Sequence, residues 1–165
     1  MNLSPTMDGA MGNGHDCIPR EVFTHFDFGD DDGWKAYLSV EPGRHQKGLH
    51  EWATFIRLAQ NGHTIVVRSE RETPGVKNPD LLFNGEVAEA KTPRGDGVDT
   101  IARNVRAASK QAQTIIIDLL QSERDPAQAW QEIQTAAARY GANGRIRRYL
   151  LLLKDRTERW GYVEC

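Results

Sequence analysis

Asn78-Pro-Asp-Leu-Leu-Phe-Asn-Gly-Glu-Val-Ala-Glu-Ala-Lys-Thr-Pro93 is the stretch that decides the fold. Its Asn84-Gly85 pair predicts a two-residue hairpin turn, because both residues tolerate positive φ. Residues 80–83 and 86–91 then form the two antiparallel strands. Side chains alternate along a strand, so Glu89 and Lys91 share one face and Ala90 lies on the other. The hairpin returns Asp80 to the side of Glu89.

The segment before this hairpin predicts a helix over residues 46–60. Its apolar residues follow helical spacing, and Asn61-Gly62 ends it. The β-branched run at residues 64–67 predicts a strand. The helix is expected to bury an apolar stripe made of Leu49, Trp52, Ala53, Ile56 and Ala59, widened by Phe55 and Leu58.

The segment after the hairpin predicts a helix from about Asp99, a plausible N-cap, to Ala112. Its apolar side is Ile101, Val105, Ala108 and Ala112. Residues 114–119 predict an apolar strand at the centre of the sheet. A second helix is expected over residues 126–140, with Pro126 in its first turn and Gly141 at its end. Strands are predicted at 148–153 and 159–163. This order predicts an α/β fold, a mixed central sheet with helices on both faces.

Charge divides the 165 residues into two parts. Residues 1–41 hold eight acidic and two basic residues, a net charge of −6, whereas residues 42–165 have a net charge of +4. We therefore predict an acidic, partly flexible N-terminal arm over residues 1–44 and a functional domain over 45–165. Aromatic residues within 21–44 are expected to pack onto the domain, but no secondary structure is assigned there. Cys17 and Cys165 share no metal-binding spacing and are interpreted as free thiols.

Several classes of protein are not supported by the sequence. The longest apolar run, residues 149–153, is far shorter than the ~20 residues of a membrane span. No signal peptide is recognisable at the N-terminus. The Arg94-Gly95-Asp96-Gly97 loop lacks the lysine and the serine or threonine of a phosphate-binding P-loop.

The predicted convergence of Asp80, Glu89 and Lys91 points to phosphodiester cleavage. Carboxylate oxygens hold hard divalent cations, which polarise a phosphoryl oxygen and acidify a bound water. A lysine stabilises the negative charge that develops during the reaction. Glu51, one turn from Phe55, can project from the buried side of its helix and complete the set. The alternative is an ordinary exposed ion pair worth less than ~1 kcal/mol.

The helix at residues 99–112 carries a basic stripe made of Arg103, Arg106 and Lys110. Asn104 and Gln111 form an adjacent polar line. A stripe of this kind suits contacts with nucleic-acid phosphates. It is also compatible with a solvated helix face.

Together, residues 78–93, Arg103-Asn104, Ser109-Lys110-Gln111-Ala112 and Ile115-Ile116-Ile117-Asp118-Leu119 resemble the C-terminal toxin domains of bacterial contact-dependent growth inhibition systems. The resemblance covers about residues 46–154. It implies an αβββαβ core like that of type IIS restriction endonucleases, of the PD-(D/E)xK superfamily. It further implies a transfer-RNA substrate, a divalent cation (Mg²⁺, Mn²⁺ or Zn²⁺), a cognate immunity protein and action in the bacterial cytoplasm of a target cell.

The family motif falls on Asp80, Glu89 and Lys91 as catalytic residues. Glu51 is the helix carboxylate, and Glu51, Asp80 and Glu89 are the metal ligands. Less specific positions fall on Thr92 and Gln111. With the polar and basic residues of the helix, they form the expected substrate-binding set: Thr92, Arg103, Asn104, Arg106, Lys110 and Gln111.

Two other functions remain open from the sequence. A barnase-like ribonuclease would work without metal, using Lys91, Thr92, Arg103 and His50 to stabilise the phosphate and move protons. A non-catalytic interaction module, such as an immunity or capsid-associated protein, would use the acidic N-terminal part to cover a basic surface.

Overall fold

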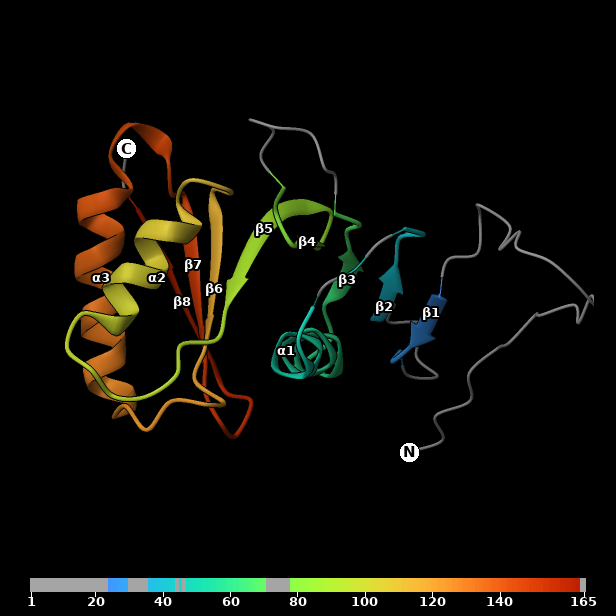
Figure 1. Cartoon of the computed structure of the whole chain (residues 1–165), viewed down its shortest axis with the longest axis horizontal. Helices are drawn as coiled ribbons and strands as arrows, with labels where there is room; N and C mark the ends of the chain where they lie inside the picture. Colours follow the sequence, from blue (N-terminus) through green and yellow to red (C-terminus); the bar gives the residue numbers. More distant parts are fainter. Residues whose placement is uncertain (1–23, 30–35, 44, 46, 71–77, 164–165) are drawn as a thin grey trace, which may run out of the picture.

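The strands of the sheet follow one another in chain order, as Figure 1 shows for the computed structural model. Residues 24–29, 36–43, 45, 47–70 and 78–163 are described. Their elements are β1 (Thr24–Asp27), β2 (Tyr37–Val40), α1 (Leu49–Gln60), β3 (Thr64–Val67), β4 (Leu81–Phe83), β5 (Glu86–Lys91), α2 (Thr100–Ala108), β6 (Thr114–Asp118), α3 (Pro126–Tyr140), the short 3-10 helix η1 (Ala142–Gly144), β7 (Arg148–Leu152) and β8 (Glu158–Tyr162).

The sheet is mixed, as predicted. β3, β4 and β5 are antiparallel neighbours, while β5, β6 and β7 run parallel. At the edges, β1 is antiparallel to β2, β2 is parallel to β3, and β8 is antiparallel to β7. The segment from α1 to β6 has the predicted αβββαβ order. α2 provides the crossover that parallel strands require between β5 and β6.

The hairpin that joins β4 to β5 has the predicted form. Asn84 and Gly85 both have positive φ, 50° and 83°. The register pairs Phe83 with Glu86 and Leu81 with Ala88. Asp80 immediately precedes β4, so this register sets it opposite Glu89.

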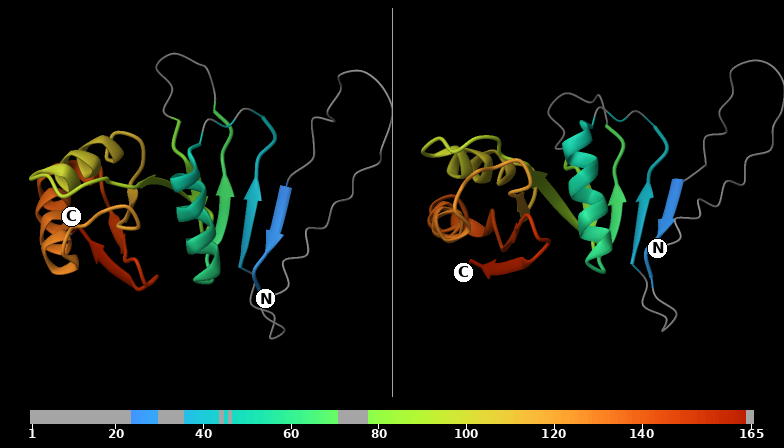
Figure 2. Two further views of the ribbon diagram at one scale, coloured as in Figure 1. Left: turned by 60° about the horizontal axis from the view of Figure 1, so that its bottom comes forward. Right: turned by 90° about the horizontal axis from the view of Figure 1, so that it is seen from below.

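Helices cover both faces of the sheet (Figures 1 and 2). One apolar cluster joins Phe55 and Leu58 of α1 to strand residues that include Ile116. The other joins α2 and α3 to the neighbouring Ile115 and Ile117. Because side chains alternate along a strand, β6 supplies apolar residues to both layers. All five of its residues are buried, as expected for a central strand.

The buried face of α1 differs from the predicted stripe. Leu49 is 90% exposed and Ile56 is 38% exposed, whereas Phe55, Leu58 and Ala59 are fully buried. Thr54 and Arg57 are buried beside them, because both hydrogen-bond to Asp118 on β6. These hydrogen bonds to Asp118 turn Thr54 and Arg57 toward the sheet, so the orientation of α1 differs from the one that its apolar residues alone favour.

Two helix boundaries also differ from prediction. α1 begins at residue 49 instead of 46, after a capping box in which Glu51 accepts from the main-chain N–H of Gly48 at 2.7 Å. α2 ends at Ala108 instead of Ala112. Asp99 occupies the predicted N-cap position of α2, but it has a left-handed φ of 66° and its side chain makes no capping hydrogen bond.

Regular structure also appears where the sequence assigned none. β1 and β2 lie within residues 21–44 and extend the sheet beyond β3. Strands of only four residues are too short to show a periodicity that would identify them without their partners. The division of the chain at residue 44 stays a prediction. Residues 1–20, Cys17 and Cys165 lie outside the described residues.

None of the helices in the described part of the chain has the length and apolar character needed to span a membrane.

Candidate active site

Asp80 and Glu89 meet across the β4–β5 hairpin. The main-chain N–H of Asp80 donates to Oε2 of Glu89 at 3.1 Å. Both residues are buried, with 7% and 4% of their surface exposed. Glu89 lies between Ala88 and Ala90, which belong to the α1-side core cluster. Two acidic side chains are therefore held together at a position where solvent screens them poorly.

Each carboxylate is paired with a lysine. Nζ of Lys91 donates to Oε1 of Glu89 at 2.6 Å. Nζ of Lys47 donates to Oδ1 of Asp80 and lies 4.0 Å from Oε1 of Glu51. The sequence analysis placed Lys91 beside Glu89 but did not single out Lys47. The only local signal for Lys47 was its i, i+4 spacing from Glu51.

The electrostatics of the site reflect burial and like charge. Burial raises the pKa of Glu89, and the negative charge of Asp80 raises it further, against the opposing effect of Lys91. Burial lowers the pKa of Lys91, but the negative charges of Glu89, Asp80 and Glu51 outweigh it, so its net pKa is raised. Lys91 is therefore a stable cation, and Glu89 is a carboxylate whose charge is unfavourable in this environment.

One oxygen of the site lacks a partner. Oδ2 of Asp80 is buried and accepts no hydrogen bond from the described residues. An unsatisfied buried carboxylate oxygen is costly, and a cation would satisfy it. A divalent ion beside Asp80 and Glu89 would also relieve the repulsion that raises the pKa of Glu89. On these grounds the donor set fits a hard cation.

The complete predicted ligand set is not gathered. Within the described residues, no group of three or more His, Cys, Asp or Glu side chains is arranged to hold a metal ion. Glu51 is close enough to affect Lys91, but its Oε2 is engaged by the capping box. Of the three predicted metal ligands, Asp80 and Glu89 are in hydrogen-bond contact, and Glu51 lies at the edge of the site.

The predicted substrate-binding residues have varied surroundings. Arg103, Arg106 and Lys110 are exposed along and just beyond α2. Oε1 of Gln111 accepts from the main-chain N–H of Asn78 at 3.3 Å, which ties the end of the α2 region to the site. The amide of Asn104 donates to the carbonyl of Thr100 within its own helix. Thr92, directly after Lys91, is half-buried.

A buried polar network braces α1 against the sheet. Arg57 donates to Oδ1 of Asp118 and to the carbonyl of Leu153. Thr54 donates to Oδ2 of Asp118 at 2.6 Å. This network fixes the helix that presents Glu51. Asp118 follows an isoleucine run, and its partners lie 61 and 64 residues away, so local spacing did not reveal them.

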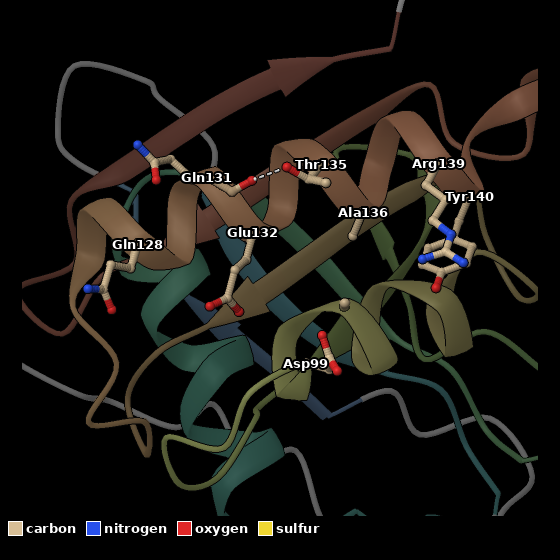
Figure 3. A pocket seen from close by; sticks show the side chains of 9 residues that line it. Asp99, Gln128, Gln131, Glu132, Thr135, Ala136, Arg139 and Tyr140 are labelled. Carbon is tan, nitrogen blue, oxygen red and sulfur yellow. Dashed lines mark hydrogen bonds between the residues drawn. The ribbon is translucent and has the colours of Figure 1, made fainter.

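A separate hollow of about 350 Å³ lies between α2 and α3 (Figure 3). Its lining includes Asp99, Gln128 and Glu132. The guanidinium of Arg139 lies 5.4 Å from the ring centre of Tyr140 at one end. None of the candidate catalytic residues lines this hollow.

His50 lies beside the site at the start of α1. Its Nδ1 is 3.0 Å from a guanidinium nitrogen of Arg94. This contact places an arginine from the loop after β5 next to the helix that carries Glu51. It gives His50 a partner but does not bring it into hydrogen-bond contact with Asp80 or Glu89.

A relative with a named activity matches part of this chain. The tRNA nuclease CdiA-2 of Burkholderia pseudomallei (strain 1026b) is 32% identical over 81 residues. That match covers 48% of this chain and 2% of the relative, so the chain spans only a small fraction of the relative's length.

A solved structure shares the fold. It is the CdiA-CT/CdiI toxin and immunity complex from Burkholderia pseudomallei, with a TM-score of 0.51 and 24% identity. The superposition covers 76% of this chain and 98% of the matched chain. The model of the contact-dependent growth inhibition CdiA C-terminal domain matches residues 77–157, which include Asp80, Glu89 and Lys91. Over residues 77–157 the chain is therefore similar to the contact-dependent growth inhibition CdiA C-terminal domain family.

Proposed function

We propose that this chain is a toxin nuclease that cleaves RNA with the aid of a divalent cation. The observation that carries the proposal is the joining of Asp80, Glu89 and Lys91 on one hairpin within the family-matched region. The curated relative is named a tRNA nuclease, which favours transfer RNA as the substrate.

Each residue of the site has a role in this proposal. Asp80 and Glu89 would hold the cation, and Glu51 lies at the margin of this pair. When bound, the cation polarises the phosphoryl oxygen and favours ionisation of the attacking water. Lys91, a stable cation by its raised pKa, neutralises charge on the reacting phosphate. Lys47 holds Asp80 in place through Oδ1 and leaves Oδ2 open.

A partner follows from the same proposal. The matched structure is a complex of a toxin with its immunity protein. We propose an acidic immunity protein for this chain, drawn to the excess of basic residues in residues 42–165. The chain would act in the cytoplasm of a target bacterium. Expression of the active chain alone is expected to stop bacterial growth, and co-expression of the immunity protein to restore it.

The test is incubation of the purified chain with total bacterial RNA and with bulk transfer RNA. Mg²⁺, Mn²⁺ or Zn²⁺ is supplied in separate reactions, and a chelator in another, with Asp80→Ala as the control. Cleavage that requires metal and Asp80 supports the proposal. Cleavage of equal rate in chelator would favour the barnase-like mechanism with Lys91 and His50. No degradation under any condition would favour a non-catalytic interaction module.

A further inference from the structure

A second, larger hollow lies at the end of the sheet where β6 and β7 begin. Its volume is about 760 Å³. The residues that matter for its chemistry are Glu86, Gln111, Arg145, Arg147, Arg148 and Tyr162. The lining thus contains three guanidinium groups and one carboxylate. Glu86 and Val87, at the start of β5, are part of its lining, but the residues assigned to metal binding and to the basic stripe of α2 are not.

Arg148, one of the lining residues, is held in place by several contacts. Its Nε donates to Oγ1 of Thr114 at 3.0 Å, and its guanidinium pairs with Glu86 at 2.8 Å. The same guanidinium lies over the rings of Phe83 and Trp160, at 6.0 and 5.8 Å from their centres. Glu86, the one carboxylate of the lining, is therefore already paired with Arg148. It does not offset the positive charges of Arg145 and Arg147.

Arg145 and Arg147 are exposed and make no side-chain hydrogen bond or ion pair with the described residues. The main chain of Arg147 is held by two hydrogen bonds. The main-chain N–H of Arg147 donates to Gln113 at 2.9 Å, and its carbonyl accepts from Val163 at 3.0 Å. Two guanidinium groups without partners among the described residues suit anionic groups that come from outside the chain.

The hollow leads to the catalytic hairpin. Gln111 lines it and also binds the main chain of Asn78, two residues before Asp80. Val87 lines it as well, and Glu89 is two residues further along β5, about 7 Å for an extended strand. Tyr162, 69% exposed, pairs in register with Arg148 and adds an aromatic surface. Aromatic side chains beside basic groups are typical of sites that stack bases and hold phosphates.

We infer that this hollow binds the backbone of the RNA next to the bond being cleaved, with Arg145 and Arg147 on phosphates and Tyr162 against a base. This inference rests on the proposed nuclease function. It assigns substrate binding to a segment at the β7–β8 end of the sheet, which the basic stripe of α2 does not include.

The test compares Arg145→Ala/Arg147→Ala with a matched control, Lys154→Ala/Arg159→Ala. The control removes the same charge from exposed residues at the opposite end of the β7–β8 pair. Binding of fluorescently labelled bulk transfer RNA is measured between about 50 and 200 mM salt, in an Asp80→Asn background, with the RNA checked on a gel afterwards.

The Arg145→Ala/Arg147→Ala variant, called the groove variant below, is expected to bind RNA about tenfold more weakly at low salt. The slope of log affinity against log salt concentration should flatten by about 1.5, because two phosphate contacts are lost. The control should keep the parent slope. Tyr162→Ala should weaken binding at least about fivefold, while Tyr162→Phe keeps it. Parent affinity and slope in the groove variant would overturn the inference.

The remaining outcomes separate this inference from the proposed function. If wild type cleaves RNA while the groove variant binds like the control, only the assignment of the hollow fails. If the parent chain neither binds nor cleaves RNA, the nuclease proposal fails and the inference falls with it. Poly-aspartate is measured in parallel as a mimic of an acidic protein. If the groove variant loses its binding of poly-aspartate but keeps its binding of RNA, the hollow serves an acidic protein and the RNA assignment is overturned.

Discussion

The main-chain N–H of Asp80 donates a hydrogen bond of 3.1 Å to Oε2 of Glu89. Lys91 occupies the other oxygen of Glu89 at 2.6 Å. Glu89 is therefore bonded at both oxygens, whereas Asp80 has a buried, unpartnered Oδ2. The two acidic residues are chemically unequal, and this inequality makes Asp80 the more sensitive position for ligand binding and Glu89 the more sensitive one for pH.

Asp80→Ala and Asp80→Asn are expected to abolish RNA cleavage, because each removes a charged oxygen ligand from a site that needs several. Lys91→Ala should slow cleavage about 10²–10³-fold, the usual effect of losing one charge-stabilising donor. Excess metal should not rescue Lys91→Ala. The measurement is a cleavage time course over a metal titration, with circular dichroism to verify folding. Full activity of folded Asp80→Ala in chelator would contradict the metal mechanism.

The rate of cleavage should depend on the ionisation of Glu89. Burial and Asp80 raise its pKa above the ordinary value of 4.5, so the protonated, inactive form persists to higher pH. At subsaturating metal, where most of the enzyme is metal-free, the acidic limb of the pH–rate profile is therefore expected above pH 4.5. Lys91, with its pKa raised above 10.5, should contribute no basic limb at neutral pH. Initial rates at constant ionic strength test this, and an acidic limb at or below 4.5 would contradict it.

Glu89→Gln should stabilise the fold at neutral pH. A carboxyl whose pKa is raised by folding favours the native state below its unfolded pKa, and that contribution is lost as pH rises through the folded pKa. Glutamine retains an acceptor for Asp80 without the charge. We expect a gain of about 0.5–2 kcal/mol at pH 8 that shrinks toward acidic pH. Urea denaturation at several pH values measures it. Equal differences at all pH values would exclude this explanation.

Asp118→Ala should destabilise the fold by about 3–5 kcal/mol, because it leaves the buried guanidinium of Arg57 without its carboxylate. The apolar double variant Arg57→Met/Asp118→Leu should cost less, since no buried charge remains. Glu123→Ala is a suitable control: its ion pair with Lys154 is exposed, and its loss should change stability by less than about 1 kcal/mol. Urea denaturation of the three variants would decide the matter.

Charge reversal at Arg103, Arg106 and Lys110 should weaken RNA affinity and flatten its salt dependence, because each phosphate contact releases counterions. Arg106 lies 6.0 Å from the ring centre of Tyr140, so Arg106→Glu alone should also be tested for folding. If the folded triple variant keeps the salt slope of the parent chain, these three residues form only a solvated helix face and do not contact RNA phosphates.

Local sequence determined the elements whose information lies within a few residues. The Asn84-Gly85 turn set the register of β4 and β5, and with it the approach of Asp80 to Glu89. Strands 64–67 and 86–91 and the helix at 126–140 have the predicted bounds. Strong periodicity and a turn that requires positive φ leave little freedom for alternatives.

Tertiary structure alone decided the features that depend on distant partners. β2 pairs with the edge of β3, and β1 pairs with β2 in turn, which four-residue strands do not reveal by themselves. The orientation of α1 follows Asp118, more than sixty residues away from its partners Thr54 and Arg57. Likewise Lys47 reaches Asp80 across 33 residues, and Arg145, Arg147 and Tyr162 meet only where β7 and β8 close the sheet. Hydrogen bonds and burial act between groups that are close in space, so these placements follow from the sheet order and not from spacing along the chain.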